Sequence, residues 1–198
     1  MAFFLAALYP VFAVPAKVED RYIKTAPRGL DGMAYMRYAN NQGYCAKDQA
    51  AQFPLINDYD AIKWMQDHVT GSPTIIEEGA AAGNQYCWSA RFSIYTGLPG
   101  VVGWQWHQQQ QRAALDAKVV TDRVDDVHAF YSTPGIEYAR AILQRYNVKY
   151  VVVGGMEKVF NDAAGFAKFN AMTQSGDLRI AYQNEGTTLY EVMTTPGS

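Results

Sequence analysis

The chain has 198 residues, of which 49% are hydrophobic and only 18% are charged, so it can bury a substantial core and is not wholly disordered. Its 17 Lys and Arg nearly balance its 19 Asp and Glu. Without a cluster of cations, this balance argues against nucleic acid as a partner, because binding to phosphates needs clustered Lys and Arg.

The first segment, residues 1–16, contains no charged side chain, and four charged residues then follow within 17–21. Sixteen helical residues would cover about 24 Å, which is less than the roughly 30 Å of a bilayer's hydrocarbon core. Pro10 and Pro15 are also expected to kink or end a helix. Three interpretations stay open: a signal peptide that lacks its basic region, a core helix, and the end of a transmembrane helix that leaves the bilayer near Tyr9. We favour the third interpretation.

After this segment the chain alternates predicted helices and strands. Residues 17–52 are rich in Gly, Asn and Pro and read as an irregular juxtamembrane segment, with one possible helical turn at 30–36. The hydrophobic periodicity and the turn residues predict helices over 58–69, 88–97, 105–131, 135–146 and 163–172, and strands over 73–79, 99–104, 148–155, 178–183 and 187–192.

The fold class follows from this order of elements. The strand at 148–155 is too apolar to have a face in water, so we expect it at the centre of a parallel sheet. Strands separated by helices indicate βαβ crossovers, and the turn at 184–186 indicates a closing hairpin. We therefore predict an α/β domain over 53–198, with a mostly parallel three-layer sheet and a C-terminal antiparallel hairpin, preceded by the end of a transmembrane helix.

Two acids, Glu77 and Glu78, follow the first predicted strand, at the edge where open α/β sheets place their ligands. One of them could accept hydrogen bonds from a sugar hydroxyl or pair with Arg91, which lies in the crossover that follows. A structural acid, either solvated or in an ion pair, is the alternative.

A second candidate is the sequence GWQWHQQQQR, residues 103–112. Trp104 and His107 follow a predicted strand and precede four Gln and Arg112. Aromatic faces beside amide and imidazole donors suit a carbohydrate, which has apolar C–H faces and polar rims. The alternative is the start of a helix that packs on the edge of the sheet.

Other site chemistries have weak support. The three His are far apart in sequence and no metal-binding motif includes them, so we expect no metal. No nucleophile elbow and no phosphate-binding loop is present, so we expect no cofactor and disfavour a soluble nucleotide-binding enzyme. Cys45 and Cys87 exclude a disulfide-dense scaffold, but they could form one disulfide in an oxidising compartment or remain two reduced thiols.

Several motifs, in order, resemble one family. The most specific are YPV-x-A-x-P followed by DR, R-x-S-x-x-TGLP-x-x-x-GW-x-x-H, and R-x-x-DV-x-x-x-YST, which begins at Arg123. They resemble the C-terminal part of the YYY-domain family of large prokaryotic membrane proteins, which are similar to the GT-C class of glycosyltransferases that use lipid-linked phosphosugars. The matching segments are 8–22, 30–36, 58–79, 90–112, 122–133 and 142–158.

The resemblance implies that residues 1–16 end the last transmembrane helix and that the α/β domain lies on the extracytoplasmic side of the cell membrane. It also implies that the catalytic acid of such an enzyme is not in this chain. Two positions depart from the family, which tends to have Glu and Trp where this chain has Gln108 and Gln111. If that Glu has a role, this chain has lost it.

The first hypothesis is therefore an extracytoplasmic domain of a GT-C-like glycosyltransferase, or of a degenerate relative, that is not catalytic by itself and could contact a carbohydrate or lipid-linked sugar. The rival is a non-catalytic accessory or assembly subunit of a membrane complex. In either case one polar patch at the carboxyl edge of the sheet is expected, formed by Glu77, Arg91, Trp104, His107, Arg112 and Arg123.

Overall fold

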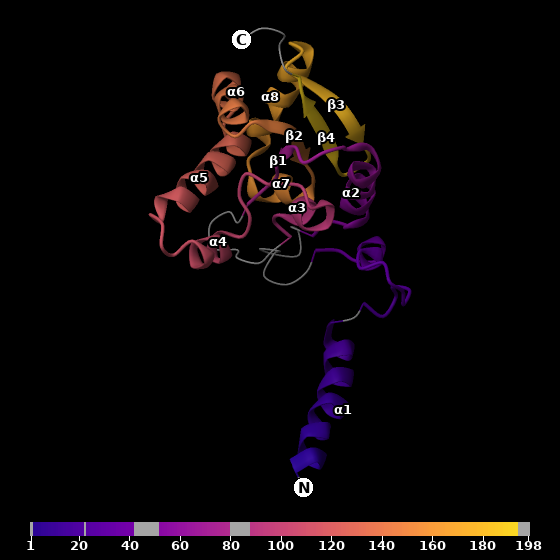
Figure 1. The fold of residues 1–198 in the computed structure, drawn as a ribbon. Coiled ribbons are helices and arrows are strands. Elements are labelled where there is room, and N and C mark those ends of the chain that lie inside the picture. The colour runs from indigo at the N-terminus through magenta and orange to yellow at the C-terminus, as the bar shows by residue number, and fades with distance from the viewer. Residues whose placement is uncertain (1, 22, 42–51, 80–87, 194–198) are drawn as a thin grey trace.

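A four-stranded mixed sheet, in the order β1-β2-β4-β3, organises the computed structural model, which describes residues 2–21, 23–41, 52–79 and 88–193 (Figure 1). β1 (Thr74–Ile76) pairs in parallel with β2 (Val148–Val153). β4 (Thr188–Val192) is antiparallel both to β2 and to the edge strand β3 (Leu178–Gln183). The domain is thus α/β, and the predicted hairpin is confirmed.

The expectation of a mostly parallel sheet is wrong, because the predicted strand at 99–104 does not form. That segment contributes only a bridge between Ile75 and Gly100, flanked by two backbone hydrogen bonds, and then leaves the sheet. β1 has three residues and offers little edge to pair with. Val101 and Val102 are nevertheless buried, which explains why the segment reads as a strand.

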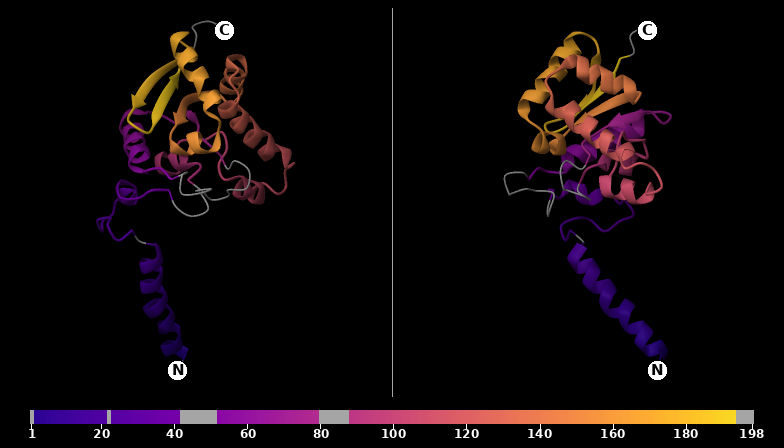
Figure 2. Two further views of the ribbon diagram at one scale, coloured as in Figure 1. Left: turned by 180° about the vertical axis from the view of Figure 1, so that it is seen from behind. Right: turned by 90° about the vertical axis from the view of Figure 1, so that its left-hand side faces the viewer.

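Helices cover both faces of the sheet (Figures 1 and 2). The side chains of β2 alternate between two cores, as the pleat requires: Val151 and Val153 face one core, and Val152 faces the other. The first core is built with α5 (Lys118–Ser132), α6 (Ile136–Arg145) and α8 (Ala163–Gln174), and the second with the 3₁₀ turn η1 (Ala34–Arg37), α2 (Ile56–His68) and α3 (Arg91–Thr96).

The remaining short helices follow extended segments. α4 (Gln105–Gln111) comes after the segment that leaves the sheet, and α7 (Gly155–Phe160) comes directly after β2. The single helix expected over 105–131 is in fact two helices, α4 and α5. Residues 112–117 separate them, with turns closed by Arg112 and Asp116.

Helix α1 (Ala2–Arg21) projects away from the α/β body (Figures 1 and 2). It continues through Pro10 and Pro15 and takes in the charged residues at 17–20, so the helix does not end at either proline. Its uncharged stretch is short, and no helix in the described part of the chain is both long and apolar enough to cross a bilayer. A complete transmembrane helix is therefore not present among these residues.

Gly165 allows α8 to approach the end of α5. A Cβ at this position would overlap the backbone carbonyl of Tyr131, and Lys168 fixes the contact by donating to the carbonyls of Tyr131 and Thr133. We expect Gly165→Ala to lower the free energy of unfolding by about 1–3 kcal/mol, because backbone must move to admit the methyl group.

Chemical denaturation of this variant beside Gly29→Ala, whose new methyl group would meet nothing within 4 Å, checks the prediction. Equal stability of the two variants would contradict the close packing of α8 on α5.

Candidate functional site

A buried ionic cluster lies where β1 and β2 end. Its centre is Arg91, the first residue of α3, whose exposed fraction is 1%. Four carboxylates surround it, from three different parts of the chain, and each is at most 2% exposed. We call this group the Arg91 cluster: Arg91, Asp58, Glu77, Glu78, Glu157 and Asn161.

Arg91 donates a hydrogen bond within the cluster from each of its three guanidinium nitrogens. Its Nε donates to Asp58 Oδ2 at 2.5 Å, and Nη1 and Nη2 donate to the two oxygens of Glu157 at 3.1 and 2.8 Å. Glu77 Oε2 lies farther away, 3.8 Å from Nη1. Such a two-pronged arginine–carboxylate contact is among the strong charge-assisted hydrogen bonds.

Glu77 mainly orders the start of α3. One of its oxygens accepts the N–H of Phe92 at 2.9 Å, and the other accepts both the N–H and the hydroxyl of Ser93 at 2.8 Å. The two N–H groups are backbone donors that the first turn of a helix leaves without a partner in the helix itself. The pair of Glu77 and Arg91 expected from the sequence is therefore present, but it is the longest of the three ion pairs of Arg91.

Glu157 joins the ends of the two parallel strands. Besides Arg91, it accepts the backbone N–H groups of Glu78 and Gly154, at 2.8 and 2.7 Å. Asn161 donates to Glu78 Oε2 at 2.5 Å and to the Glu157 carbonyl at 3.0 Å. A Cβ on Gly154 would lie 2.7 Å from both Arg91 Nη2 and Asp58 Oδ1, so only glycine fits against the cluster here.

Burial and charge move the pKa values within the cluster in opposite directions. Burial raises the pKa of Glu77 to about 7 and that of Glu78 to about 8. The Arg91 guanidinium holds the pKa of Glu157 below its usual value, despite burial. The cluster therefore keeps protons on some of its carboxyl groups near neutral pH, and this reduces the negative charge that one arginine has to balance.

The cluster has the chemistry of a structural core. Tyr131, which lies beside it, donates its hydroxyl to the carbonyls of Ile76 and Val152 at 3.0 and 2.7 Å. Its carboxylates are buried and already hydrogen-bonded: those of Asp58, Glu77 and Glu157 by Arg91, backbone N–H groups or hydroxyls, and that of Glu78 by the Asn161 amide. They are therefore out of reach of a substrate. Among the residues that the structure describes, no group of three or more His, Cys, Asp or Glu could hold a metal ion.

The structure divides the predicted patch into two parts. Glu77 and Arg91 are buried, whereas Trp104, His107, Arg112 and Arg123 line the surface beside α4. Ser93 connects the two parts, because its hydroxyl bonds Glu77 while its side chain lines a surface cavity.

Two cavities adjoin each other beside α4, and both are lined by Gly103 and Gln108. The larger, of about 290 Å³, also has Trp104, His107 and Gln111 in its wall. The smaller, of about 170 Å³, is lined by Arg112 and Arg123. Trp104 donates to the Ser89 carbonyl at 3.0 Å and stacks on His107, with ring centroids 6.1 Å apart.

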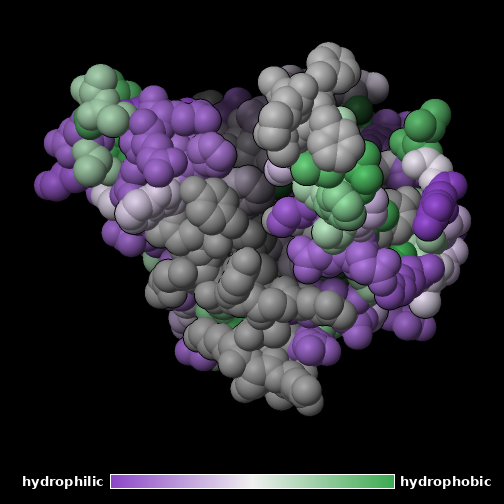
Figure 3. Space-filling view, turned by 90° about the horizontal axis from the view of Figure 1, so that it is seen from below, coloured by the Kyte–Doolittle hydropathy of each residue, from purple (hydrophilic) through white to green (hydrophobic). Residues whose placement is uncertain are grey.

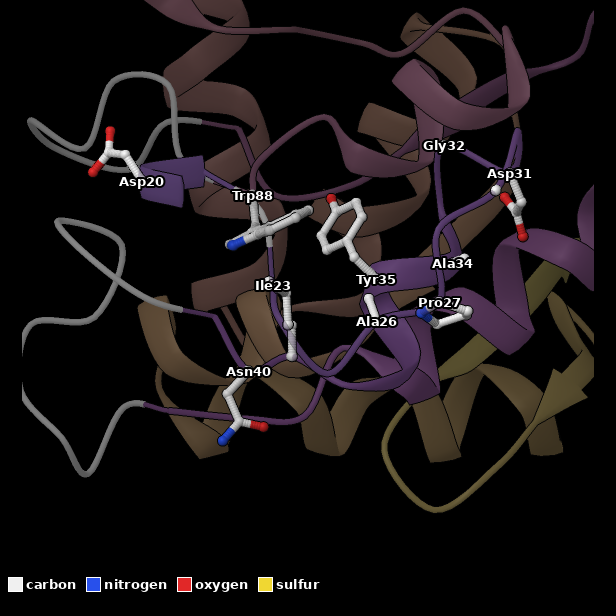
Figure 4. Close-up of a pocket in the computed structure, with 12 residues that line it drawn as sticks. Asp20, Ile23, Ala26, Pro27, Asp31, Gly32, Ala34, Tyr35, Asn40 and Trp88 are labelled. Atoms are coloured by element: carbon white, nitrogen blue, oxygen red, sulfur yellow. The ribbon is translucent and has the colours of Figure 1, made fainter. Parts of the chain in front are cut away.

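A third cavity, of about 730 Å³, lies between the end of α1 and the body (Figure 4). The rings of Tyr35 and Trp88 stand side by side in its wall, with centroids 5.9 Å apart. Asp31 also lines it and accepts the N–H of Met33 at 2.9 Å. The sequence analysis did not predict this cavity.

Sequence reasoning missed the strongest partners of Arg91. From the sequence, Asp58 is expected only to begin a helix. Glu157 is not singled out, because it is an isolated acidic residue two positions after the glycine pair Gly154–Gly155. The signal that could have found Glu157 is that glycine pair, which directly follows the most apolar strand. Cys45 and Cys87 lie outside the described residues.

No protein-family model matches the chain, and no curated protein sequence matches it. Among solved structures, the C-terminal globular domain of an oligosaccharyltransferase from Archaeoglobus fulgidus is similar, with a TM-score of 0.43 and 12% sequence identity. The alignment covers 68% of this chain and 95% of that domain. This likeness is too distant to carry over an activity, and membership of the YYY-domain family is not confirmed by it.

The Arg91 cluster predicts strong coupling between its members. Arg91→Ala should lower the free energy of unfolding by about 3–5 kcal/mol, because it leaves buried carboxylates without their counter-ion. In double-mutant cycles by denaturant unfolding, the coupling of Arg91→Ala with Glu157→Gln should exceed that with Glu77→Gln, which lies farther away.

The exposed Arg140, which pairs with Asp177, is the matched control, and Arg140→Ala should change stability little. Strict additivity of the Arg91 and Glu157 variants would show that the two side chains do not interact.

The raised pKa values predict a loss of stability as the pH rises from 5 to 8. A carboxyl group whose pKa is higher in the folded than in the unfolded chain binds its proton more tightly when folded. The stabilisation is therefore full below the unfolded value of 4.5 and is lost as the pH passes through about 7 for Glu77 and about 8 for Glu78. Glu157, whose pKa is lowered, acts only at more acidic pH.

Thermal unfolding between pH 5 and 8 measures this slope. Glu78→Gln should flatten it, whereas the exposed Glu185→Gln should not. A wild-type protein that becomes more stable over this range would contradict the prediction.

Proposed function

We propose that the chain is the extracytoplasmic α/β domain of a membrane-attached protein similar to the GT-C glycosyltransferases, and that it does not itself transfer sugar. The observation that carries the proposal is the apolar, solvent-exposed surface of α1. The resemblance of the motifs supports the kind of parent protein and the side of the membrane.

The surface of α1 suits lipid better than water. Tyr9 and Phe12 are 75% and 67% exposed, and Val11 and Val14 are also more than half exposed. These residues occupy different sides of the helix, and a helix that is apolar all round is normally buried in a core or a membrane. Helix α1 projects away from the α/β body (Figure 2).

The charges of α1 indicate which end faces water. Lys17, Glu19 and Asp20 lie in its last turns, next to the body, while its earlier turns carry no charge. We infer that the apolar turns enter the bilayer as the end of a span and that the charged turns mark its surface. The α/β body then stands in the aqueous phase, which suits the hydrophilic side chains that gather at the left of Figure 3.

The non-catalytic role is supported by the state of the acids at the carboxyl edge of the sheet. In an open α/β enzyme this edge commonly binds the ligand. Here Glu77, Glu78 and Glu157 are buried there and bound to Arg91, Asn161 and backbone groups. A carboxyl group that is buried and hydrogen-bonded stabilises the fold, and it cannot reach a glycosyl donor to act as an acid or base.

The proposal predicts that α1 attaches the chain to lipid. After removal of detergent in the presence of phosphatidylcholine vesicles, the full chain should float with the vesicles in a density gradient. Val11→Asp with Phe12→Asp should abolish flotation, because each carboxylate in the bilayer costs several kcal/mol, about 2.5–3.5 at the centre of a span.

The matched control is Leu115→Asp with Ile180→Asp, which adds the same charge at exposed apolar residues of the body and should leave flotation unchanged. Both variants should keep the cooperative thermal unfolding of the wild type. Flotation of the α1 variant, or loss of its cooperative unfolding, would show that α1 is not a membrane attachment.

A further inference from the structure

The smaller cavity beside α4, between α4 and the start of α5, has the lining of an anion site. Arg112 and Arg123 line it together with Gln108 and residues 100–103. The described residues that line it include no Asp or Glu. We propose that this cavity, which we call the arginine hollow, binds a phosphate group of a ligand.

Arg112 and Arg123 differ from four other arginines of the chain, which form ion pairs. Arg140, Arg145 and Arg179 each form an ion pair, as does the buried Arg91. Within the part of the chain that the structure describes, neither Arg112 nor Arg123 forms one. Their positive charge is therefore not neutralised by a carboxylate of the described residues and attracts an anion to the hollow.

Local contacts hold both side chains in place without using up their donors. Arg123 donates from Nη1 to the Val101 carbonyl at 3.1 Å, and its guanidinium lies 5.2 Å from the centroid of the Tyr146 ring. Arg112 donates from Nη1 to Gln108 Oε1. A guanidinium has five N–H donors, so each arginine keeps donors for a ligand.

The arginine hollow is large enough to enclose one small chemical group but not a complete ligand. Its volume of about 170 Å³ is below the roughly 300–1,000 Å³ of pockets that enclose a complete small molecule. The guanidinium fork matches the oxygens of phosphate in geometry and charge. The adjoining cavity of about 290 Å³, with Trp104 and His107 in its wall, can receive the uncharged remainder of the ligand.

Two sources of phosphate can reach the hollow. α4 lies at the lower end of the body, the side from which α1 projects, and hydrophilic side chains gather there at the left of Figure 3. If α1 enters a bilayer, as proposed above, a lipid headgroup lies on this side. A phosphorylated molecule free in solution can reach the hollow whether or not α1 enters a bilayer.

The first test uses inorganic phosphate and the full chain in detergent micelles, and therefore does not depend on attachment to a bilayer. In amide NMR spectra, phosphate should cause saturable shifts at Gly103, Gln108 and Arg112. Val119→Asp places a carboxylate on the wall of the hollow without removing any hydrogen bond. Because like charges placed side by side repel, we expect it to weaken phosphate binding by about tenfold or more.

Leu115→Asp is the matched control, since it adds the same charge at an exposed residue that does not line the hollow, and it should bind phosphate within about twofold of the wild type. Saturable shifts that Val119→Asp does not weaken, or the absence of saturable shifts in the wild type, would overturn the proposal.

The second test distinguishes the two sources. If the headgroup of a lipid is the ligand, wild type should bind vesicles that contain phosphatidic acid more tightly than Val119→Asp does, and inorganic phosphate should reduce this difference. If the ligand is a free phosphate compound, the two proteins should bind these vesicles equally while the phosphate shifts in micelles persist. Either result supports a phosphate site, whereas failure of flotation alone bears only on α1.

Discussion

The fold depends on a single buried arginine. Arg91 joins α2 through Asp58, the end of β1 through Glu77 and the start of α7 through Glu157, and these segments are otherwise separate in the chain. A buried charge is tolerated only when it is paired and hydrogen-bonded, so each partner depends on the others. The cluster thereby sets where both parallel strands end and where α3 begins.

The same interaction decides where function can lie. The carboxyl edge of the sheet, where a ligand would be expected, is filled by the Arg91 cluster and is closed to solvent. Polar and aromatic side chains that remain accessible lie farther out, beside α4 and below the body near α1. The acids of the Arg91 cluster therefore stabilise the fold, and the accessible polar surface lies outside the cluster.

Local signals in the sequence predicted several elements correctly. β2 could be predicted because its apolar run has no face for water, and the hairpin because turn residues at 184–186 separate two alternating runs. The position of Glu77 and Glu78 at the end of β1 also follows from the sequence. The prediction failed where tertiary packing decides the structure. Val101 and Val102 are buried without forming a strand. The local signal of proline also misled, because α1 continues through Pro10 and Pro15.

The cluster was only partly predictable for a related reason. Arg91 and Glu77 are close in sequence and belong to one strand–helix crossover, so their contact could be expected. Asp58 and Glu157 reach Arg91 only because α2 packs against α3 and α7 directly follows the end of β2. That arrangement depends on the tertiary fold, and the glycine pair before Glu157 is the single local signal that points to part of it.

The most direct test of this account is a titration of the carboxyl carbons of Glu77, Glu78 and Glu157 by ¹³C NMR, with assignments from the Glu→Gln variants. The account predicts that Glu77 and Glu78 titrate near pH 7 and 8, as their raised pKa values require, while Glu157 stays ionised to below its usual range. Three carboxyl groups that all titrate near 4.5, the ordinary value for Glu, would show that they are not buried around Arg91 and would contradict the account.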